Sequence, residues 1–267
     1  MDPSVRARLP RPLLAAALAM SLLVAGCAHP SSPAVTPGSA TPAQQAVANG
    51  TVTDKPLPAS VLDLPLRDPS GRTVTLGSLH GKTVVLTDFL TTCQEVCPMT
   101  SVNFRDVADA AGRAGLATSV QLVEVTVDPQ RDDPARLAAY QKLYGPVRPD
   151  WTFLTATAAV IAAIWKEFGV AYYTTPNTPP LPADWLTGKP LTYDVSHQDV
   201  VFLIDPDGHE RWLVSGNPST AGVAPPSALV RFLDDDGRKN LAQPEAPDWT
   251  AKDVEAAISW LDGRPLR

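Results

Sequence analysis

The amino-acid sequence predicts an α/β protein with a mixed central sheet and helices on both of its faces. Apolar, β-branched runs typical of buried strands occur at residues 82–90 and 121–127. A segment with helical spacing of apolar residues follows the first run, and a capped helix start follows the second. Two more apolar runs, 200–204 and 210–214, flank a turn in the manner of a hairpin. The resulting order, β-α-β-α-β-α-β-β-α, is that of helices alternating with the strands of one sheet.

The first predicted elements precede and include the first core strand. Residues 62–66 and 73–76 alternate weakly around the turn Asp68–Gly71, which predicts two short strands. Lys82–Leu90 (KTVVLTDFL) predicts a strand buried on both faces. A helix is expected over Ser101–Ala114, where the apolar residues recur with helical spacing.

The middle of the chain continues the alternation. Gln121–Val127 predicts a second core strand. A helix is expected from 133 to about 144, because Asp133 suits an N-cap and Pro134 suits the first helical position. Trp151–Leu154 then predicts a short strand.

The last elements complete the sheet. Ala158–Phe168 predicts a helix, and the hairpin at 200–214 turns at Asp205–Gly208. An amphipathic helix is expected at Ala251–Leu261.

The N-terminal segment has the features of an export signal. Three arginines precede the apolar run Leu13–Ala25, which has the length of a signal-peptide core. The run ends in Leu23–Cys27 (LVAGC), which resembles the bacterial lipobox, whose cysteine is lipidated. We expect residues 1–26 to be a lipoprotein signal peptide and Cys27 to be the lipid-carrying mature N-terminus. An uncleaved anchor or a plain signal peptide with an incidental cysteine is the alternative, and in each case the folded part is exported. With a lipid on Cys27, the domain would lie outside the cytoplasm, anchored to a membrane of the bacterial cell envelope.

Composition divides the rest of the chain. Residues 27–55 are rich in Pro, Ala, Ser and Thr, which predicts a flexible tether. Residues 56–267 are expected to form the domain, with a C-terminal extension from about residue 220. The formal charge is −6 and no basic run occurs beyond the N-terminus, which excludes a nucleic-acid partner.

Cys93 and Cys97 form a C-x-x-x-C-P motif directly after the first core strand. Such a pair is a disulfide, a redox couple, a metal clamp or two buried thiols. A structural disulfide is a poor explanation, because so small a loop constrains the unfolded chain little. Pro98 places Cys97 at a helix N-terminus, where the dipole favours a thiolate. This predicts two partly exposed sulfurs of low pKa, which suit either thiol exchange or a soft metal.

A third ligand would favour the metal. Of the four histidines, His29 lies in the tether, His80 in a loop and His209 in the hairpin turn. His197 precedes the strand at 200–204, at a sheet edge from which it can reach the Cys loop; a surface histidine or a hydrogen-bonded loop histidine is the alternative. Two thiolates and one imidazole suit Cu(I), or Cu(II) with an added oxygen ligand.

Three segments together resemble the Sco (SenC) proteins, a family of thioredoxin-like, membrane-tethered copper proteins. The segments are the C-x-x-x-C-P motif, Asp128–Pro134 (DPQRDDP) and His197–Gly208 (HQDVVFLIDPDG). The resemblance covers roughly residues 56–216 and implies a thioredoxin-like fold. It also implies that Cys93, Cys97 and His197 bind copper.

The resemblance implies a copper chaperone that delivers one copper ion to the copper-centre subunit of cytochrome c oxidase, or to another envelope copper protein. The two cysteines would cycle between thiolate and disulfide, and turnover of a small substrate is not implied. A thiol–disulfide oxidoreductase acting on the cysteines of a partner copper site is the alternative, and an envelope binding protein with a regulatory disulfide is a third.

Several residues depart from the family pattern or add to it. Gln94 stands where proline is frequent, and Ser196 stands where Asp is common before the histidine. Both departures affect the surroundings of the metal. Asp128 and Arg131 either shape the loop beside the site or meet a partner.

Overall fold

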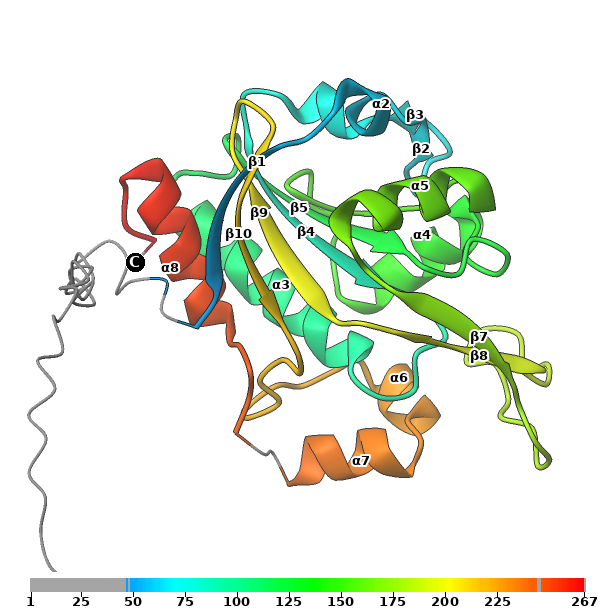
Figure 1. Ribbon diagram of the computed structural model, residues 1–267. Coiled ribbons are helices and arrows are strands. Elements are labelled where there is room, and N and C mark those ends of the chain that lie inside the picture. The colour runs from blue at the N-terminus through cyan, green and yellow to red at the C-terminus, as the bar shows by residue number, and fades with distance from the viewer. Residues whose placement is uncertain (1–46, 48, 244–245, 267) are drawn as a thin grey trace, which may run out of the picture. The chain divides into compact units, whose positions relative to one another are not determined.

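A six-stranded mixed sheet forms the centre of the computed structural model, which describes residues 47, 49–243 and 246–266 (Figure 1). Its strand order is β1-β10-β9-β4-β5-β6. β4, β5 and β6 are parallel, whereas β9, β10 and β1 join antiparallel on the other side of β4. The strands are β1 (Thr51–Pro56), β4 (Thr83–Phe89), β5 (Val120–Thr126), β6 (Trp151–Leu154), β9 (Val200–Ile204) and β10 (His209–Ser215).

Helices cover both faces of this sheet. Thr87 of β4 pairs with Glu124 of β5, and the adjacent Leu86 pairs with Phe202 of β9. Neighbouring residues of a strand point to opposite faces. Glu124 bonds to Ser101 of helix α3 (Cys97–Arg113), and the ring of Phe202 packs on helix α5 (Ala158–Phe168). These two helices therefore lie on opposite faces.

Two more helices pack beside α3. Helix α8 (Ala251–Asp262) contacts it, and helix α4 (Pro134–Leu143) ends at Tyr144, whose hydroxyl donates to the carbonyl of Pro98 at 3.4 Å. The order β4-α3-β5 with the hairpin β9-β10 and α8 is thioredoxin-like. The predicted fold class is confirmed, and so are the predicted cap at Asp133 and the core strands.

A second hairpin was not expected from the sequence. β7 (Tyr172–Pro176) pairs with β8 (Tyr193–His197), and the hairpin projects from the central sheet (Figure 1). The long segment between these strands contains Trp185. His197 is thus the last residue of a strand, rather than a loop residue before one.

The remaining short elements lie at the two ends of the described chain. β2 (Leu66–Arg67) and β3 (Thr73–Val74) pair around the predicted turn, and α2 (Ala59–Leu62) and the 3₁₀ helix η1 (Leu76–Leu79) flank them. α6 (Ser227–Phe232) and α7 (Asp235–Ala242) precede α8 and were not predicted.

The expected start of the domain at residue 56 is corrected by strand β1. Thr51–Pro56 pairs with β10 as an edge strand of the central sheet, and Val47 is buried. The expected tether therefore ends before this strand. The predicted signal peptide, the lipidation of Cys27 and His29 fall outside the described residues. In the part of the chain that the structure describes, no helix has the length and apolarity needed to cross a membrane.

Candidate metal centre

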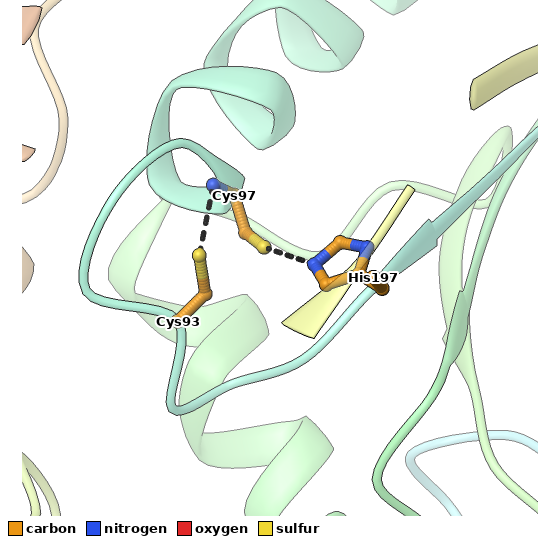
Figure 2. Close-up of side chains that lie close together, drawn as sticks. All are labelled: Cys93, Cys97 and His197. Carbon is orange, nitrogen blue, oxygen red and sulfur yellow. Dashed lines mark hydrogen bonds between the residues drawn. The ribbon is translucent and has the colours of Figure 1, made fainter. Parts of the chain in front are cut away.

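Three side chains from separate segments meet beyond the carboxyl end of β4. Cys93 lies in the loop after β4, Cys97 is the first residue of α3, and His197 is the last residue of β8. Their sulfur and nitrogen atoms lie within 4.8 Å of one another (Figure 2). The structure brings together the three residues that the sequence proposed as metal ligands.

The start of α3 holds the two sulfurs. Pro98 lies in the first turn, where no intrahelical hydrogen bond is lost by its missing N–H. The backbone N–H of Cys97 donates to Sγ of Cys93 at 3.3 Å. Sγ of Cys97 lies 3.5 Å from Nε2 of His197 (Figure 2). The sulfur of Cys93 thus accepts a hydrogen bond from the N-terminus of α3, and the sulfur of Cys97 faces the imidazole.

The two thiols differ in acidity, so the expectation of two partly exposed, low-pKa sulfurs is wrong for Cys97. Hydrogen bonding from Cys97 holds the pKa of the Cys93 thiol well below its usual value, against the effect of burial, and His197 lowers it further. Burial raises the pKa of the Cys97 thiol well above its usual value, and the neighbouring Cys93 adds to this. Only Cys93 has the predicted thiolate character.

Asp88 orients the imidazole of His197. A carboxylate oxygen of Asp88 pairs with Nδ1 of His197, and the other accepts from the N–H of Val200 at 3.0 Å. A carboxylate only accepts hydrogen bonds, so Nδ1 donates the proton. Burial disfavours the imidazolium, but the bond and charge of Asp88 outweigh burial and raise the pKa of His197 well above its usual value. Nε2 faces the sulfurs and could bind a metal once it has lost its proton.

The site opens into a small acidic cavity of about 130 Å³. Glu95, Asp194, Asp199 and Asp234 contribute to its lining beside Cys93 and His197. Burial raises the pKa of Asp199 to about 7, although the charge of His197 opposes that change. Acidic groups at the mouth favour the approach of a cation.

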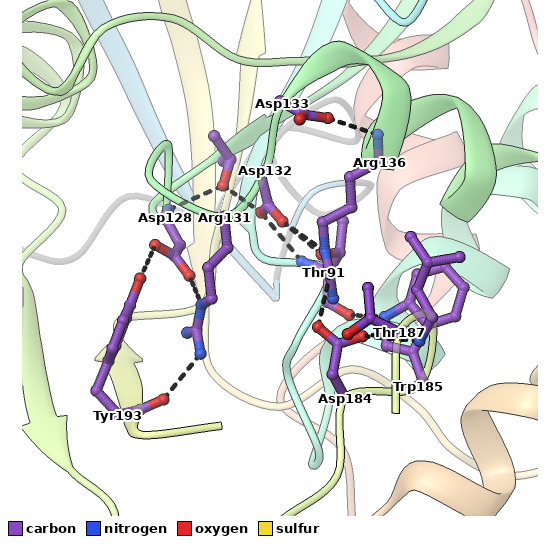
Figure 3. A network of polar contacts seen from close by, with 12 residues as sticks. Thr91, Asp128, Arg131, Asp132, Asp133, Arg136, Asp184, Trp185, Thr187 and Tyr193 are labelled. Carbon is purple, nitrogen blue, oxygen red and sulfur yellow. Dashed lines mark hydrogen bonds and ion pairs between the residues drawn. The ribbon is translucent and has the colours of Figure 1, made fainter. Parts of the chain in front are cut away.

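The Asp128–Asp133 segment positions the strand that carries His197. The guanidinium of Arg131 pairs with Asp128 and donates to the carbonyl of Tyr193 at 2.8 Å (Figure 3). The hydroxyl of Tyr193 donates to Asp128 at 3.0 Å, and the centroid of its ring lies 3.9 Å from the guanidinium carbon of Arg131. Tyr193 begins β8 and His197 ends it. Of the two alternatives for Asp128 and Arg131, these contacts support shaping of the site.

The same segment also fixes the start of the Cys loop. The buried carboxylate of Asp132 accepts from the backbone N–H of Thr91 at 3.1 Å and from the hydroxyls of Thr91 and Thr126 (Figure 3). From the other side, Nε1 of Trp185 donates to the carbonyl of Thr91 at 2.7 Å. Arg136 bonds to the Thr91 hydroxyl and pairs with Asp184 at 2.8 Å. The loop therefore begins at a residue held from two sides.

The sequence analysis missed Asp88 and Trp185. Asp88 had a recognisable signal, because it is the one charged residue between Thr83 and Phe89 of a strand that is buried throughout, and a buried charge needs a partner. Trp185 lies in an irregular segment and had no such signal. His209, expected in the hairpin turn, is instead the first residue of β10 and is partly exposed; it bonds to Asp54 at 3.1 Å.

A sequence model described as SCO1/SenC matches residues 61–224. The chain belongs to the SCO1/SenC family. The match includes Cys93, Cys97 and His197, and it ends before helices α6, α7 and α8.

Individual relatives are distant. The mitochondrial SCO2 homologue of Danio rerio is 28% identical over 55% of this chain, which spans 48% of that protein. A Stutzerimonas stutzeri protein named for copper binding is 28% identical over 58% of this chain and 69% of its own length. The copper-bound structure of Bradyrhizobium japonicum ScoI is 26% identical, covers 64% of this chain and 97% of its own, and has a TM-score of 0.47. The chain thus spans about half the length of the mitochondrial relatives it matches.

Proposed function

We propose that this chain binds one copper ion through Cys93, Cys97 and His197 and passes it to another copper protein. The observation that carries the proposal is the meeting of two sulfurs and one Asp88-held imidazole within 4.8 Å. Thiolate and imidazole are soft ligands that suit Cu(I). A structural zinc site usually has four protein ligands, and the cluster of Cys and His in the described residues has three. The copper-binding name of the Stutzerimonas relative supports the same metal.

The copper is a cargo in this proposal. Membership of the SCO1/SenC family supports delivery to the copper-centre subunit of cytochrome c oxidase, with another envelope copper protein as the alternative recipient. The Arg-containing apolar N-terminus and the LVAGC sequence support a lipid anchor at Cys27. The domain would then act outside the cytoplasm, close to the membrane that holds its recipient.

Copper stoichiometry tests the binding site. A full chain carrying Cys27→Ser should bind one Cu(I) per molecule under anaerobic conditions. The further double substitution Cys93→Ala/His197→Ala should remove this binding, whereas His209→Ala, which changes a partly exposed histidine, should leave it intact. Stoichiometric Cu(I) in the double variant would rule out the proposed site.

Asp88→Asn should weaken copper binding by about 10–100-fold, the usual effect of losing a group that orients a ligand histidine. The amide of the variant would donate to Nδ1 and leave the proton on Nε2, the atom that faces the sulfurs. Chelator competition measures the affinity. Asp199→Asn is the matched control, because Asp199 lies 3.9 Å from the same Nδ1 and is too far for a hydrogen bond. Equal losses of copper affinity in Asp88→Asn and Asp199→Asn would contradict an orienting role for Asp88.

A thiol–disulfide oxidoreductase is the second candidate, favoured by the contrast between the two thiols. Cys93 receives the N–H of Cys97, as expected of an attacking thiolate, and Cys97 is buried as expected of a resolving thiol. Cys93 would attack a partner disulfide, and Cys97 would then displace the partner thiol and leave a Cys93–Cys97 disulfide. Partner reduction that survives both His197→Ala and copper chelation would favour this function over the chaperone.

A further inference from the structure

The C-terminal extension lies directly on the middle of the metal-binding loop. We define the α6–α7 segment as residues 227–242. Nε2 of Gln94 donates to the carbonyl of Phe232 at 2.8 Å, and the N–H of Asp234 donates to the carbonyl of Gln94 at 3.1 Å. Gln94 lies between the two cysteines and is thus bonded through its side chain and its backbone.

Gly237 brings the backbone of α7 into contact with the same residue. A Cβ atom added at Gly237 would lie 2.1 Å from the carbonyl oxygen of Gln94 and 3.1 Å from Cα of Glu95. Both neighbours are backbone atoms, which cannot turn away as a side chain can. Asp234 caps this helix by accepting from the N–H of Gly237 at 2.8 Å. The cap of α7 and its contact with the Cys loop therefore involve the same residues.

The α6–α7 segment is itself anchored to the core. Leu229 and Leu233 are almost fully buried, and the hydroxyl of Thr220 donates to the carbonyl of Asn240 at 2.7 Å. The amide of Asn103 in α3 donates to the carbonyl of Ser219 at 2.9 Å. Ser219 and Thr220 precede the segment, so α3, which begins with Cys97, bonds to the stretch of chain that in turn holds Asn240 at the end of α7.

The position of the sulfurs shows what this contact opposes. Sγ of Cys97 faces His197 at 3.5 Å, and both cysteines are free thiols. A disulfide needs an S–S distance of about 2 Å and close Cβ atoms. The two sulfurs lie within 4.8 Å of each other and must approach to bonding distance to form it. Any movement of the loop between the cysteines that brings them together acts against the bonds of Gln94 to Phe232 and Asp234.

We propose that the α6–α7 segment is a clamp that positions the Cys93–Cys97 loop through Gln94, and so favours the dithiol over the disulfide and increases copper affinity. Gln94, Asp234 and Gly237 are its positioning residues. The segment lies outside the part of the chain matched by the family model. The expected increase in copper affinity rests on the proposed function. The preference for the dithiol over the disulfide holds with or without copper.

The test measures the equilibrium of the metal-free full chain (Cys27→Ser) with glutathione. Two protein thiols and one oxidised glutathione give one protein disulfide and two reduced glutathiones, and alkylation of the remaining thiols gives the equilibrium constant. Gly237→Ala should increase this constant by about tenfold, since displacement of α7 breaks two hydrogen bonds. Gln94→Ala removes one bond and should increase it by about threefold. Gly112→Ala is the matched control, because its added Cβ makes only an ordinary contact of 3.4 Å with Arg148.

A second readout separates this proposal from the proposed function. Cu(I) affinity, measured by chelator competition, should fall in Gly237→Ala and Gln94→Ala and stay within twofold in Gly112→Ala. If the wild-type chain binds no copper but the glutathione constants shift as expected, the clamp stands and the copper function falls. Constants within twofold of wild type in Gln94→Ala and in a folded Gly237→Ala would overturn the clamp. If Gly237→Ala does not fold, the glutathione equilibrium constant of Gln94→Ala alone decides whether the clamp is retained.

Discussion

Replacing Asp132 by alanine should lower the free energy of unfolding by about 3–5 kcal/mol, the range for breaking a buried ionic network by removing one partner. Its carboxylate is fully buried and bonds to Thr91 and to Thr126, with Arg136 at 3.5 Å. The substitution leaves the N–H of Thr91 and the hydroxyl of Thr126 without an acceptor in a site that water does not reach. It also removes two of the bonds that hold Thr91, the residue at which the Cys loop begins, so the candidate metal site should lose rigidity as well.

Urea unfolding measures the loss of stability, and Asp133→Ala is the control. Asp133 is the neighbouring carboxylate and caps α4 through one bond to the N–H of Arg136 at 2.8 Å. Loss of such a cap costs about 1 kcal/mol. If the two variants lose the same stability, Asp132 is not the centre of a buried network.

Much of the fold was predictable because its central strands are buried on both faces. β4, β5 and β9 are buried along their whole length, so apolar and β-branched residues dominate their sequences and make them recognisable. Helix α4 was predictable from its cap. These signals are local, and the structure agrees with them within one or two residues.

The missed elements depend on contacts that are distant in sequence. β1 (TVTDKP) is an edge strand with mostly exposed side chains and has no apolar run. β7 and β8 pair across a long irregular segment, and their exposed residues show little hydrophobic pattern. α7 begins at Asp234–Gly237, a sequence that also suits a turn. Each of these elements depends on tertiary packing for its conformation, and local sequence alone does not specify it.

The candidate site was predictable in the same uneven way. Cys93 and Cys97 were evident from their spacing and from Pro98. His197 depended on the family resemblance, and Asp88 lies 109 residues from it in sequence. Position within a buried strand marks Asp88 as a residue that needs a partner, but only the pairing of β4 with β9 and the path of β8 identify that partner.

Glu124→Gln should remove a loss of stability that the wild-type chain undergoes as the pH rises. Glu124 is fully buried behind α3; it accepts from Ser101 and from the indole N–H of Trp151, each at 2.8 Å. Burial raises the pKa of its carboxyl to about 8, although both hydrogen bonds act in the opposite direction. The folded state therefore holds a proton that the unfolded chain loses near its ordinary pKa of 4.5. The stabilisation from this group is therefore complete below pH 4.5, the pKa in the unfolded chain. It decreases progressively as the pH rises to about 8, the pKa in the folded chain.

Urea unfolding at pH 5 and pH 8 measures this contribution, which should be on the order of 3 kcal/mol over that interval. Glutamine stays neutral, accepts from Trp151 and donates to Ser101, so the variant should match wild type near pH 5 and exceed it at pH 8. Asp106→Asn, which changes an exposed carboxylate on α3, the helix that covers Glu124, should give similar differences from wild type at both pH values. An equal effect of Glu124→Gln at pH 5 and pH 8 would mean that Glu124 does not hold a proton in the folded chain. Because Ser101 lies one turn after Cys97, the ionised carboxylate of the wild-type chain should loosen the start of α3, which contributes Cys97 to the candidate metal site.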